Sequence, residues 1–213
     1  MHILDPRNPT LLSRVMEELQ TAQRPGGDID IPTLVSSRLL QSVYLEVLRM
    51  YMDVLLPREV TEEATLPMDS NNRRMHFKEG AIMMLPTYIS QYAKENWDGP
   101  PTNQFCGDRF LKTDAETGNQ VLSTAGTGHK LFPYGGGNTM CPGRLFAKQE
   151  MIAGAAVVLL AFDIEVLGFV DEKGKPQKDF IGMKQTSPGT GVVHPGGDLR
   201  IRMANKLSKE IDS

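Results

Sequence analysis

Apolar residues near the start of the chain recur at the spacing of one helix face. The stripe consists of Leu11, Leu12, Val15, Met16 and Leu19. Intervals of three and four residues predict an amphipathic helix. Asn8-Pro9 before the stripe is typical of a helix start, with a cap followed by a proline in the first turn. We expect this helix to end at the "RPGG" turn, residues 24–27.

A second helical pattern is denser. The segment "SSRLLQSVYLEVLRMYM", residues 36–52, carries apolar side chains around most of a helical circumference. A helix of this kind is buried on several sides. We expect it to begin near Pro32 and to lie inside the fold.

The next stretch favours strands. "LLPREV", "MHFK" and "AIMML" lie between residues 54 and 85 and are separated by turn residues, which predicts a small antiparallel sheet. "TYISQYAKENW" indicates a short helix at residues 87–97. Residues 98–134 are rich in Gly, Pro, Asn and Asp without periodicity, which indicates a long irregular loop. Loops of that length are usually functional or disordered.

The final part of the chain predicts a helix, a strand and a hairpin. Pro142 fits the first turn of a helix that runs to Ala161, and "FDIEVLGFV" follows as a strand. The apolar run from Ile152 to Phe162 indicates a buried helix leading into that strand. Residues 184–203 are typical of a hairpin. The fold class is therefore mainly α with small antiparallel β-sheets, in one domain without a clear linker.

Composition excludes several functions. A formal net charge of -3 argues against nucleic acid or anionic lipid as the main partner. The longest apolar run is too short to cross a bilayer, and the first ten residues lack a signal-peptide pattern. Two cysteines among 213 residues do not form a disulfide framework, so we expect free thiols in a reducing compartment.

One of these cysteines lies in "FPYGGGNTMCPGRLFAKQE", residues 132–150. A dinucleotide loop would need glycine where Met140 stands, and a phosphate loop would need Lys and Ser/Thr where Arg144 and Leu145 stand. The four histidines lack zinc-ligand spacing. The pattern fits a thiolate at a helix amino terminus, where free N–H groups favour negative sulfur. The alternative is an inert, buried cysteine beside a glycine-rich turn.

The wider pattern resembles the haem-binding loop of the cytochrome P450 superfamily. Tyr134, Gly137, Cys141 and Gly143 occupy the positions of its aromatic, first glycine, cysteine and last glycine. The resemblance implies that Cys141 is the axial ligand of haem iron and that the other three residues lie beside the haem. This sequence has tyrosine where phenylalanine is usual. It also has Thr139 where an arginine or histidine commonly pairs with a haem propionate.

The resemblance extends upstream of the loop. "LEVLRM" supplies the Glu-x-x-Arg pair as Glu46 and Arg49, and "PTNQFCGDRFL" supplies a second arginine, Arg109. These three residues are expected to form a buried structural network that supports the cysteine loop. Arg58 matches a position that often reaches a haem propionate, the alternative being a solvent-facing arginine at a sheet edge. Cys106 is interpreted as a filler without a metal role.

Basic residues flank the cysteine loop. His129, Lys130, Arg144 and Lys148 suggest a docking face for an acidic electron-donor protein, the alternative being ordinary solvated surface. The resemblance also places the segment from Pro188 to Val193 at the substrate pocket.

The resemblance covers only the C-terminal, proximal part of a family member. It implies that residues 1–213 are a single incomplete cytochrome P450 domain, without the distal helix and the N-terminal membrane anchor. The implied function is a haem-thiolate monooxygenase acting on a small hydrophobic organic substrate, with electrons from an NADPH-dependent reductase at the endoplasmic reticulum membrane. The loop is similar in style to fungal members that oxidise steroids, terpenoids or other secondary metabolites. The alternative is a truncated, non-catalytic haem-binding or vestigial protein.

Overall fold

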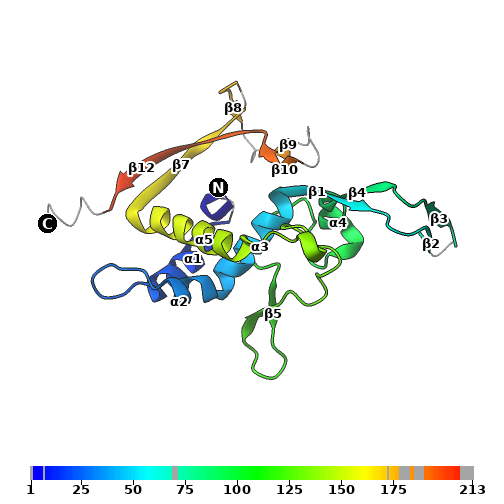
Figure 1. The fold of residues 1–213 in the computed structure, drawn as a ribbon. Helices are drawn as coiled ribbons and strands as arrows, with labels where there is room; N and C mark the ends of the chain where they lie inside the picture. The colour runs from blue at the N-terminus through cyan, green and yellow to red at the C-terminus, as the bar shows by residue number, and fades with distance from the viewer. Residues whose placement is uncertain are drawn as a thin grey trace.

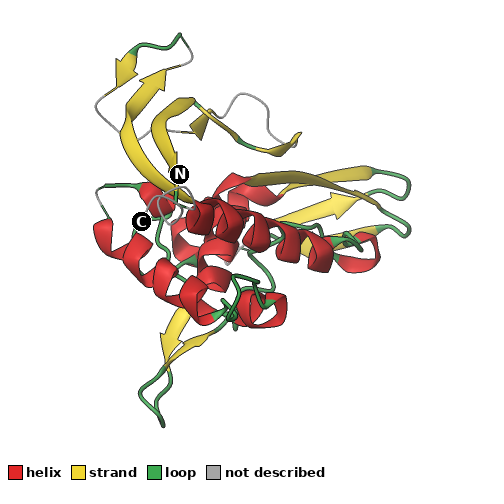
Figure 2. Ribbon diagram, turned by 90° about the vertical axis from the view of Figure 1, so that its left-hand side faces the viewer, coloured by secondary structure: helices red, strands yellow, loops and turns green. Residues whose placement is uncertain are grey.

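The computed structural model describes residues 2–6, 8–68, 72–171, 173–177, 183–184 and 190–206. Helices gather at the centre, and β-ribbons project from them (Figures 1 and 2). The helices are α1 (Pro9–Thr21), α2 (Ile31–Ser36), α3 (Arg38–Tyr51), α4 (Thr87–Tyr92) and α5 (Arg144–Ala161). Short 3-10 turns are η1 (His2–Leu4), η2 (Lys94–Asn96) and η3 (Gly137–Thr139).

The hydrophobic core lies between α1, α2, α3 and α5. The predicted stripe of α1 is confirmed, since Leu11, Val15 and Leu19 are fully buried and belong to the core cluster. Helix α3 is buried on several sides as expected: nine of its side chains are buried. It is therefore the central helix of the described residues.

The single helix expected from Pro32 is instead two helices separated at Ser37, which is extended (φ −59°, ψ 127°). The reason is a tertiary contact. The two carboxylate oxygens of Glu18, on α1, each accept a backbone N–H at 2.9 Å, one from Leu39 and one from Leu40. A carboxylate can accept hydrogen bonds from the free N–H groups of a helix start. Glu18 therefore stabilises the start of a new helix, α3, next to α1.

The antiparallel pairing predicted at residues 54–85 is present, but in two separate sheets instead of one. Strand β1 (Met52–Glu59) pairs with β4 (Ile82–Pro86), and β2 (Ala64–Pro67) pairs with β3 (Arg74–Phe77). Strand β1 also pairs with β10 (Thr190–Val192), a strand from the C-terminal part of the chain. Of the segment expected at the substrate pocket, Pro188 and Gly189 lie outside the described residues.

The expected hairpin at residues 184–203 is confirmed only at its start, where Lys184 pairs with His194, and its second half pairs with another strand. Its long strand β12 (Gly197–Asn205) pairs with β7 (Phe162–Asp171), which also pairs with β8 (Pro176–Gln177). The remaining short strands, β9 (Met183–Lys184) and β11 (His194–Pro195), pair with each other. Pairing with the long β7 strand forms a nine-residue ladder, whereas β9 and β11 are each only two residues long.

Two other predictions need correction. The helix at residues 87–97 ends at Tyr92 and continues only as η2, and the irregular loop at 98–134 contains a hairpin of β5 (Leu111–Thr113) and β6 (Gln120–Leu122). The hairpin turn is closed by Asp114, whose carboxylate accepts the N–H groups of Glu116 and Thr117. Hydrogen bonding to Thr117 lowers the pKa of Asp114.

Helix α5 ends at Ala161 as expected, but its start and its burial differ from expectation. It begins at Arg144, with Gly143 as N-cap, so Pro142 precedes the helix. Only Ile152, Ala156 and Leu159 of its side chains are buried. A single stripe at this spacing contacts the core, and the opposite face, including Phe146 and Val157, remains exposed among the described residues.

Candidate functional site: the cysteine loop

Cys141 lies at the amino end of α5, and its side chain is exposed. Its own backbone N–H donates to the carbonyl oxygen of Tyr134 at 2.9 Å, which closes the loop on itself. At the other side, the Arg144 guanidinium donates to the carbonyl oxygen of Cys141 at 3.2 Å. The sulfur is thus presented to solvent while the cysteine backbone is held on both sides.

Two of the loop's glycines are required by backbone geometry. Gly135 and Gly137 have φ angles of 79° and 63°, a region that other residues enter only with strain. A Cβ at Gly135 would also come within 3.3 Å of the Leu56 side chain. Gly143 has φ −78° and tolerates a side chain conformationally, so its expected place beside a haem does not follow from the backbone.

Arg58 reaches from β1 to the loop. Its Nη2 donates to the carbonyl oxygen of Gly136 at 2.6 Å. Both residues line a cavity of about 650 Å³ together with Phe132, Gly137 and Leu56. That volume lies within the range of about 300–1,000 Å³ typical of ligand and cofactor sites. Arg58 therefore faces the loop and its cavity, where a cation can pair with an acidic ligand group.

The three residues of the expected network meet in one buried cluster. The carboxylate of Glu46 accepts Arg49 Nε at 2.7 Å and Nη2 at 2.8 Å, and it accepts Arg109 Nε at 2.9 Å. The side chains of Glu46 and Arg49 are fully buried and that of Arg109 is 2% exposed. The backbone N–H of Cys106 adds a further bond to Glu46 at 3.0 Å.

The remaining guanidinium N–H groups bind backbone carbonyls of the 98–104 segment and its neighbours. Arg49 Nη1 donates to the carbonyl oxygens of Gln91 and Thr102, each at 2.9 Å. Arg109 donates to four carbonyls, those of Asp98, Pro100, Pro101 and Gln104. The cluster thus fixes an irregular segment that has few backbone hydrogen bonds of its own. Support of the cysteine loop through this segment stays a prediction.

The basic residues that flank the loop differ in their contacts. The ammonium of Lys148 binds the side-chain oxygen of Gln41, and burial lowers its pKa. That of Lys130 binds the carbonyl oxygen of Asn96 and lies 5.0 Å from the Trp97 ring centre. Arg144 and His129 are exposed. The exposed cationic surface beside the loop is therefore smaller than the sequence indicates.

The second cysteine has a different environment. Cys106 is half-buried, and burial raises the pKa of its thiol. Both cysteines are free. Within the described ranges, no three His, Cys, Asp or Glu side chains cluster as metal ligands, and no helix there is long and apolar enough to span a membrane.

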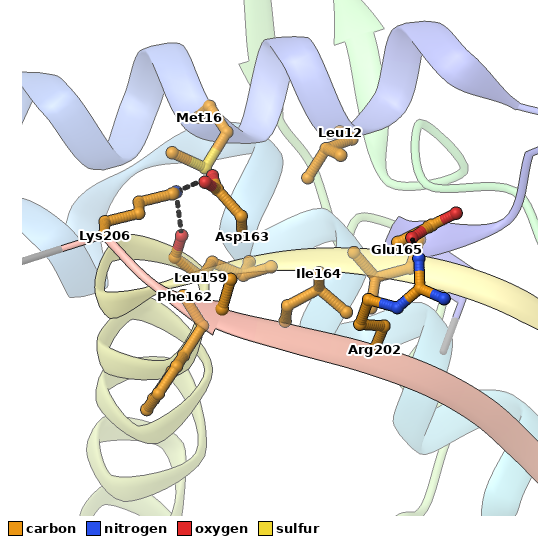
Figure 3. Close-up of a pocket in the computed structure, with 11 residues that line it drawn as sticks. Leu12, Met16, Leu159, Phe162, Asp163, Ile164, Glu165, Arg202 and Lys206 are labelled. Carbon is orange, nitrogen blue, oxygen red and sulfur yellow. Dashed lines mark hydrogen bonds and ion pairs between the residues drawn. The ribbon is translucent and has the colours of Figure 1, made fainter. Parts of the chain in front are cut away.

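A second cavity, of about 340 Å³, lies away from the cysteine loop between α1 and the β7–β12 ribbon (Figure 3). Leu12, Met16 and Ile164 form much of its apolar wall. Two ion pairs stand at its rim: Arg202 with Glu165 at 2.6 Å, and Lys206 with Asp163 at 3.9 Å. Because the rim charges compensate each other, this cavity offers no net charge for a ligand.

Comparison with known proteins decides the family. The model of the family described as "Cytochrome P450" matches residues 6–191. This chain belongs to the cytochrome P450 family. The cytochrome P450 monooxygenase calL of Penicillium decumbens is 35% identical over 202 residues, which are 92% of this chain and 36% of that protein. The 25-hydroxycholesterol 7-alpha-hydroxylase of Rattus norvegicus is 31% identical over 87% of this chain and 43% of its own length.

The fold comparison agrees. The structure of retinoic acid-bound cyanobacterial CYP120A1 matches with a TM-score of 0.65 and 21% identity, over 93% of this chain and 39% of that one. The structure is thus a partial P450 fold of few helices and small antiparallel sheets. The chain spans little more than a third of the length of these P450 relatives.

The residues present fit the haem that the family implies. An exposed thiol at a helix amino terminus is a suitable donor for iron. Glycines without Cβ atoms leave room for a flat group, and the adjacent cavity carries Arg58 for an acidic substituent. The fit is therefore one of the iron donor, Cys141, and of the cavity beside it.

Two residues of the site were missed by sequence reasoning. Tyr44 donates to or accepts from the hydroxyl of Tyr134 at 2.6 Å, and the buried amide of Gln91 donates to the carbonyl oxygens of Arg49 and Met52. In the sequence, Tyr44 is one member of the dense apolar pattern of residues 36–52, and nothing there sets it apart. Gln91 gave no signal, because a glutamine in a short polar helix is usually exposed.

Proposed function

We propose that this chain is the thiolate-bearing part of a haem-thiolate monooxygenase, with Cys141 as the axial ligand of haem iron. The observation that carries the proposal is the combination at Cys141 of an exposed side chain and a backbone N–H held by Tyr134 at 2.9 Å. A ligand residue needs both an accessible donor atom and a fixed position. Membership of the cytochrome P450 family supports it.

The chain's own residues have three tasks in this proposal. The amino end of α5 places Cys141 beside free backbone N–H groups, whose partial positive charge suits an anionic donor to iron. Gly137 would let the loop approach a haem without an intervening side chain, and Tyr134 and Gly143 would lie beside it. Arg58 would pair with an acidic group of the haem. When bound, the haem with its thiolate ligand supplies the chemistry of O–O bond cleavage and mono-oxygenation.

The substrate class and the location are further parts of the proposal. The substrate is a small hydrophobic organic molecule, in the class of steroids, terpenoids or other secondary metabolites. The names of relatives support this class, since one is a 25-hydroxycholesterol hydroxylase. We place the complete monooxygenase at the endoplasmic reticulum membrane.

Electrons are proposed to come from an NADPH-dependent reductase that docks beside Lys130, Arg144 and Lys148. Because Lys130 and Lys148 have intramolecular partners, Arg144 is the residue to test. Arg144→Glu should slow reduction by the reductase, whereas Arg144→Gln, which also loses the contact with the Cys141 carbonyl, should slow it less. Equal rates in both variants and the wild type would remove the docking face.

The proposal is tested by absorption of the 213-residue chain reconstituted with haem. The reduced carbon-monoxide complex of the wild type should show the red-shifted Soret band of thiolate ligation. Cys106→Ser is the matched control, because Cys106 is the chain's other thiol and is half-buried. The band should persist in Cys106→Ser and disappear in Cys141→Ser. A band that survives loss of Cys141, or a wild type without the band, refutes the assignment.

A second candidate is a non-catalytic haem-binding protein. It is favoured by the chemistry of the site, because the thiol of Cys141 and the guanidinium of Arg58 can bind a haem without taking part in a further reaction. A thiolate band without substrate oxidation in the presence of a reductase would support this candidate.

A further inference from the structure

A hydrogen bond between two phenols ties the cysteine loop to the central helix. The hydroxyl oxygens of Tyr44, on α3, and Tyr134, in the loop, are 2.6 Å apart. Tyr44 is 9% exposed and belongs to the hydrophobic core. Burial, assisted by the bond to Tyr134, raises the pKa of Tyr44 far above its ordinary value, so its hydroxyl keeps its proton.

Tyr134 also holds Cys141 through its backbone. The carbonyl oxygen of Tyr134 accepts the backbone N–H of Cys141 at 2.9 Å. Tyr134 is thus fixed through its side chain and fixes Cys141 through its backbone. A continuous path of two hydrogen bonds leads from the buried face of α3 to the amide of the cysteine.

Helix α3 carries both Tyr44 and the ionic cluster of Glu46 and Arg49. Tyr44 and Glu46 are two residues apart, which turns their side chains by about 200° around the helix. Glu46 faces Arg49 and Arg109 on one side, and Tyr44 faces the loop on the other. The helix is therefore a rigid element from which the phenol of Tyr44 can fix a loop residue.

Other contacts hold different parts of the loop. Arg58 binds the carbonyl oxygen of Gly136 at 2.6 Å, and the hydroxyl of Thr139 binds the same oxygen at 3.3 Å. Both act on the middle of the loop. The bond that bears on the amide of Cys141 comes from Tyr134, so loss of the phenol pair should affect the cysteine more than the glycines.

We propose that Tyr44 is a positioning residue for Cys141: its phenol fixes Tyr134, and Tyr134 holds the cysteine amide at the amino end of α5. The consequence for bound haem rests on the proposed function. A cysteine whose backbone is less well fixed presents its sulfur to iron less consistently, so a smaller share of the haem is bound through Cys141.

The positioning itself is testable without haem. A chain labelled with ¹⁵N-cysteine gives two backbone amide signals, from Cys141 and Cys106. In Tyr44→Phe, which keeps the ring and loses the hydroxyl, hydrogen exchange at Cys141 should accelerate about fivefold, corresponding to the loss of one hydrogen bond of about 1 kcal/mol. The Cys106 amide, which donates to Glu46 at 3.0 Å, is the internal reference and should not change.

Two further variants make the experiment specific. Tyr92→Phe removes a hydroxyl that donates to the carbonyl oxygen of Met50 at 2.8 Å, also on α3, and should leave exchange at Cys141 unchanged. Tyr134→Phe and the double variant Tyr44→Phe/Tyr134→Phe should match Tyr44→Phe, because all three lose the same bond. Unchanged exchange at Cys141 in Tyr44→Phe, or equal acceleration in Tyr92→Phe, overturns the proposal.

Reconstitution with haem separates this proposal from the proposed function. If the wild type has the thiolate band, the share of that band should fall in Tyr44→Phe and stay at the wild-type level in Tyr92→Phe. An unchanged share in Tyr44→Phe overturns the consequence for haem. A wild type without the band refutes the proposed function, while the exchange rates still decide whether Tyr44 positions Cys141.

Discussion

Replacement of Glu46 by glutamine tests whether the buried ionic cluster stabilises the fold. Glutamine has nearly the volume of glutamate, so packing is preserved. It removes the one carboxylate between Arg49 and Arg109, both of which lie within 3.0 Å of it. It also places an NH₂ donor against guanidinium donors. Two buried positive charges then lose their compensation.

The magnitude follows from burial. Removing one partner of a buried ion pair costs about 3–5 kcal/mol, and the Glu46 side chain is 0% exposed. With an unfolding entropy of about 2.1 cal/mol/K per residue, the 213 residues of the chain give a decrease in Tm of roughly 7–11 °C. The backbone carbonyls around both arginines keep this loss from becoming larger, because they still accept the remaining N–H groups.

Urea unfolding followed by circular dichroism measures the loss. Glu165→Gln is the matched control: Glu165 also pairs with an arginine, Arg202, at 2.6 Å, but the two side chains are 59% and 68% exposed. An exposed pair contributes about 0–1 kcal/mol. Glu46→Gln should lower the urea midpoint strongly without a change in m, and Glu165→Gln should hardly lower it. Equal losses in the two variants would refute the reasoning from burial.

Three further changes have defined outcomes. Gly137→Ala should destabilise the chain by about 1–2 kcal/mol in thermal unfolding, because its φ is 63°, whereas Gly154→Ala, in open space on α5, should stabilise it by about 0.5–1 kcal/mol. Thr33→Ala should raise the pKa of Asp30, seen by NMR titration, since the Thr33 hydroxyl lowers it. A lowered pKa stabilises the fold above the unfolded-state pKa, and this stabilisation disappears as pH falls through the folded value. The variant should lose the part of it that depends on the Thr33 hydroxyl, while the contact of Asp30 with Arg24 remains. Ser42→Ala leaves the buried backbone N–H of Phe110 without its hydrogen-bond acceptor, and should lower the free energy of unfolding, measured with urea, by about 1–3 kcal/mol.

Prediction from sequence succeeded where the signal is local. The stripe of α1 and the dense pattern of α3 repeat at helical spacing, and both helices are where that spacing indicated. Prediction from sequence failed where the local structure depends on a residue far away in the chain. The break at Ser37 depends on Glu18 of another helix, and β10 pairs with β1 from more than 130 residues away. No window of neighbouring residues contains such information.

The cysteine loop shows the same division. The order of residues around Cys141 alone indicated a thiolate at a helix start and the resemblance to the family. Only the tertiary structure decided which groups hold the loop: Arg58 on Gly136 and Tyr44 on Tyr134. Likewise, the sequence contained Glu46 and Arg109, but the fold brought them together across 63 positions. Hydrogen-bond partners depend on distance in space, whereas sequence patterns record only neighbours along the chain.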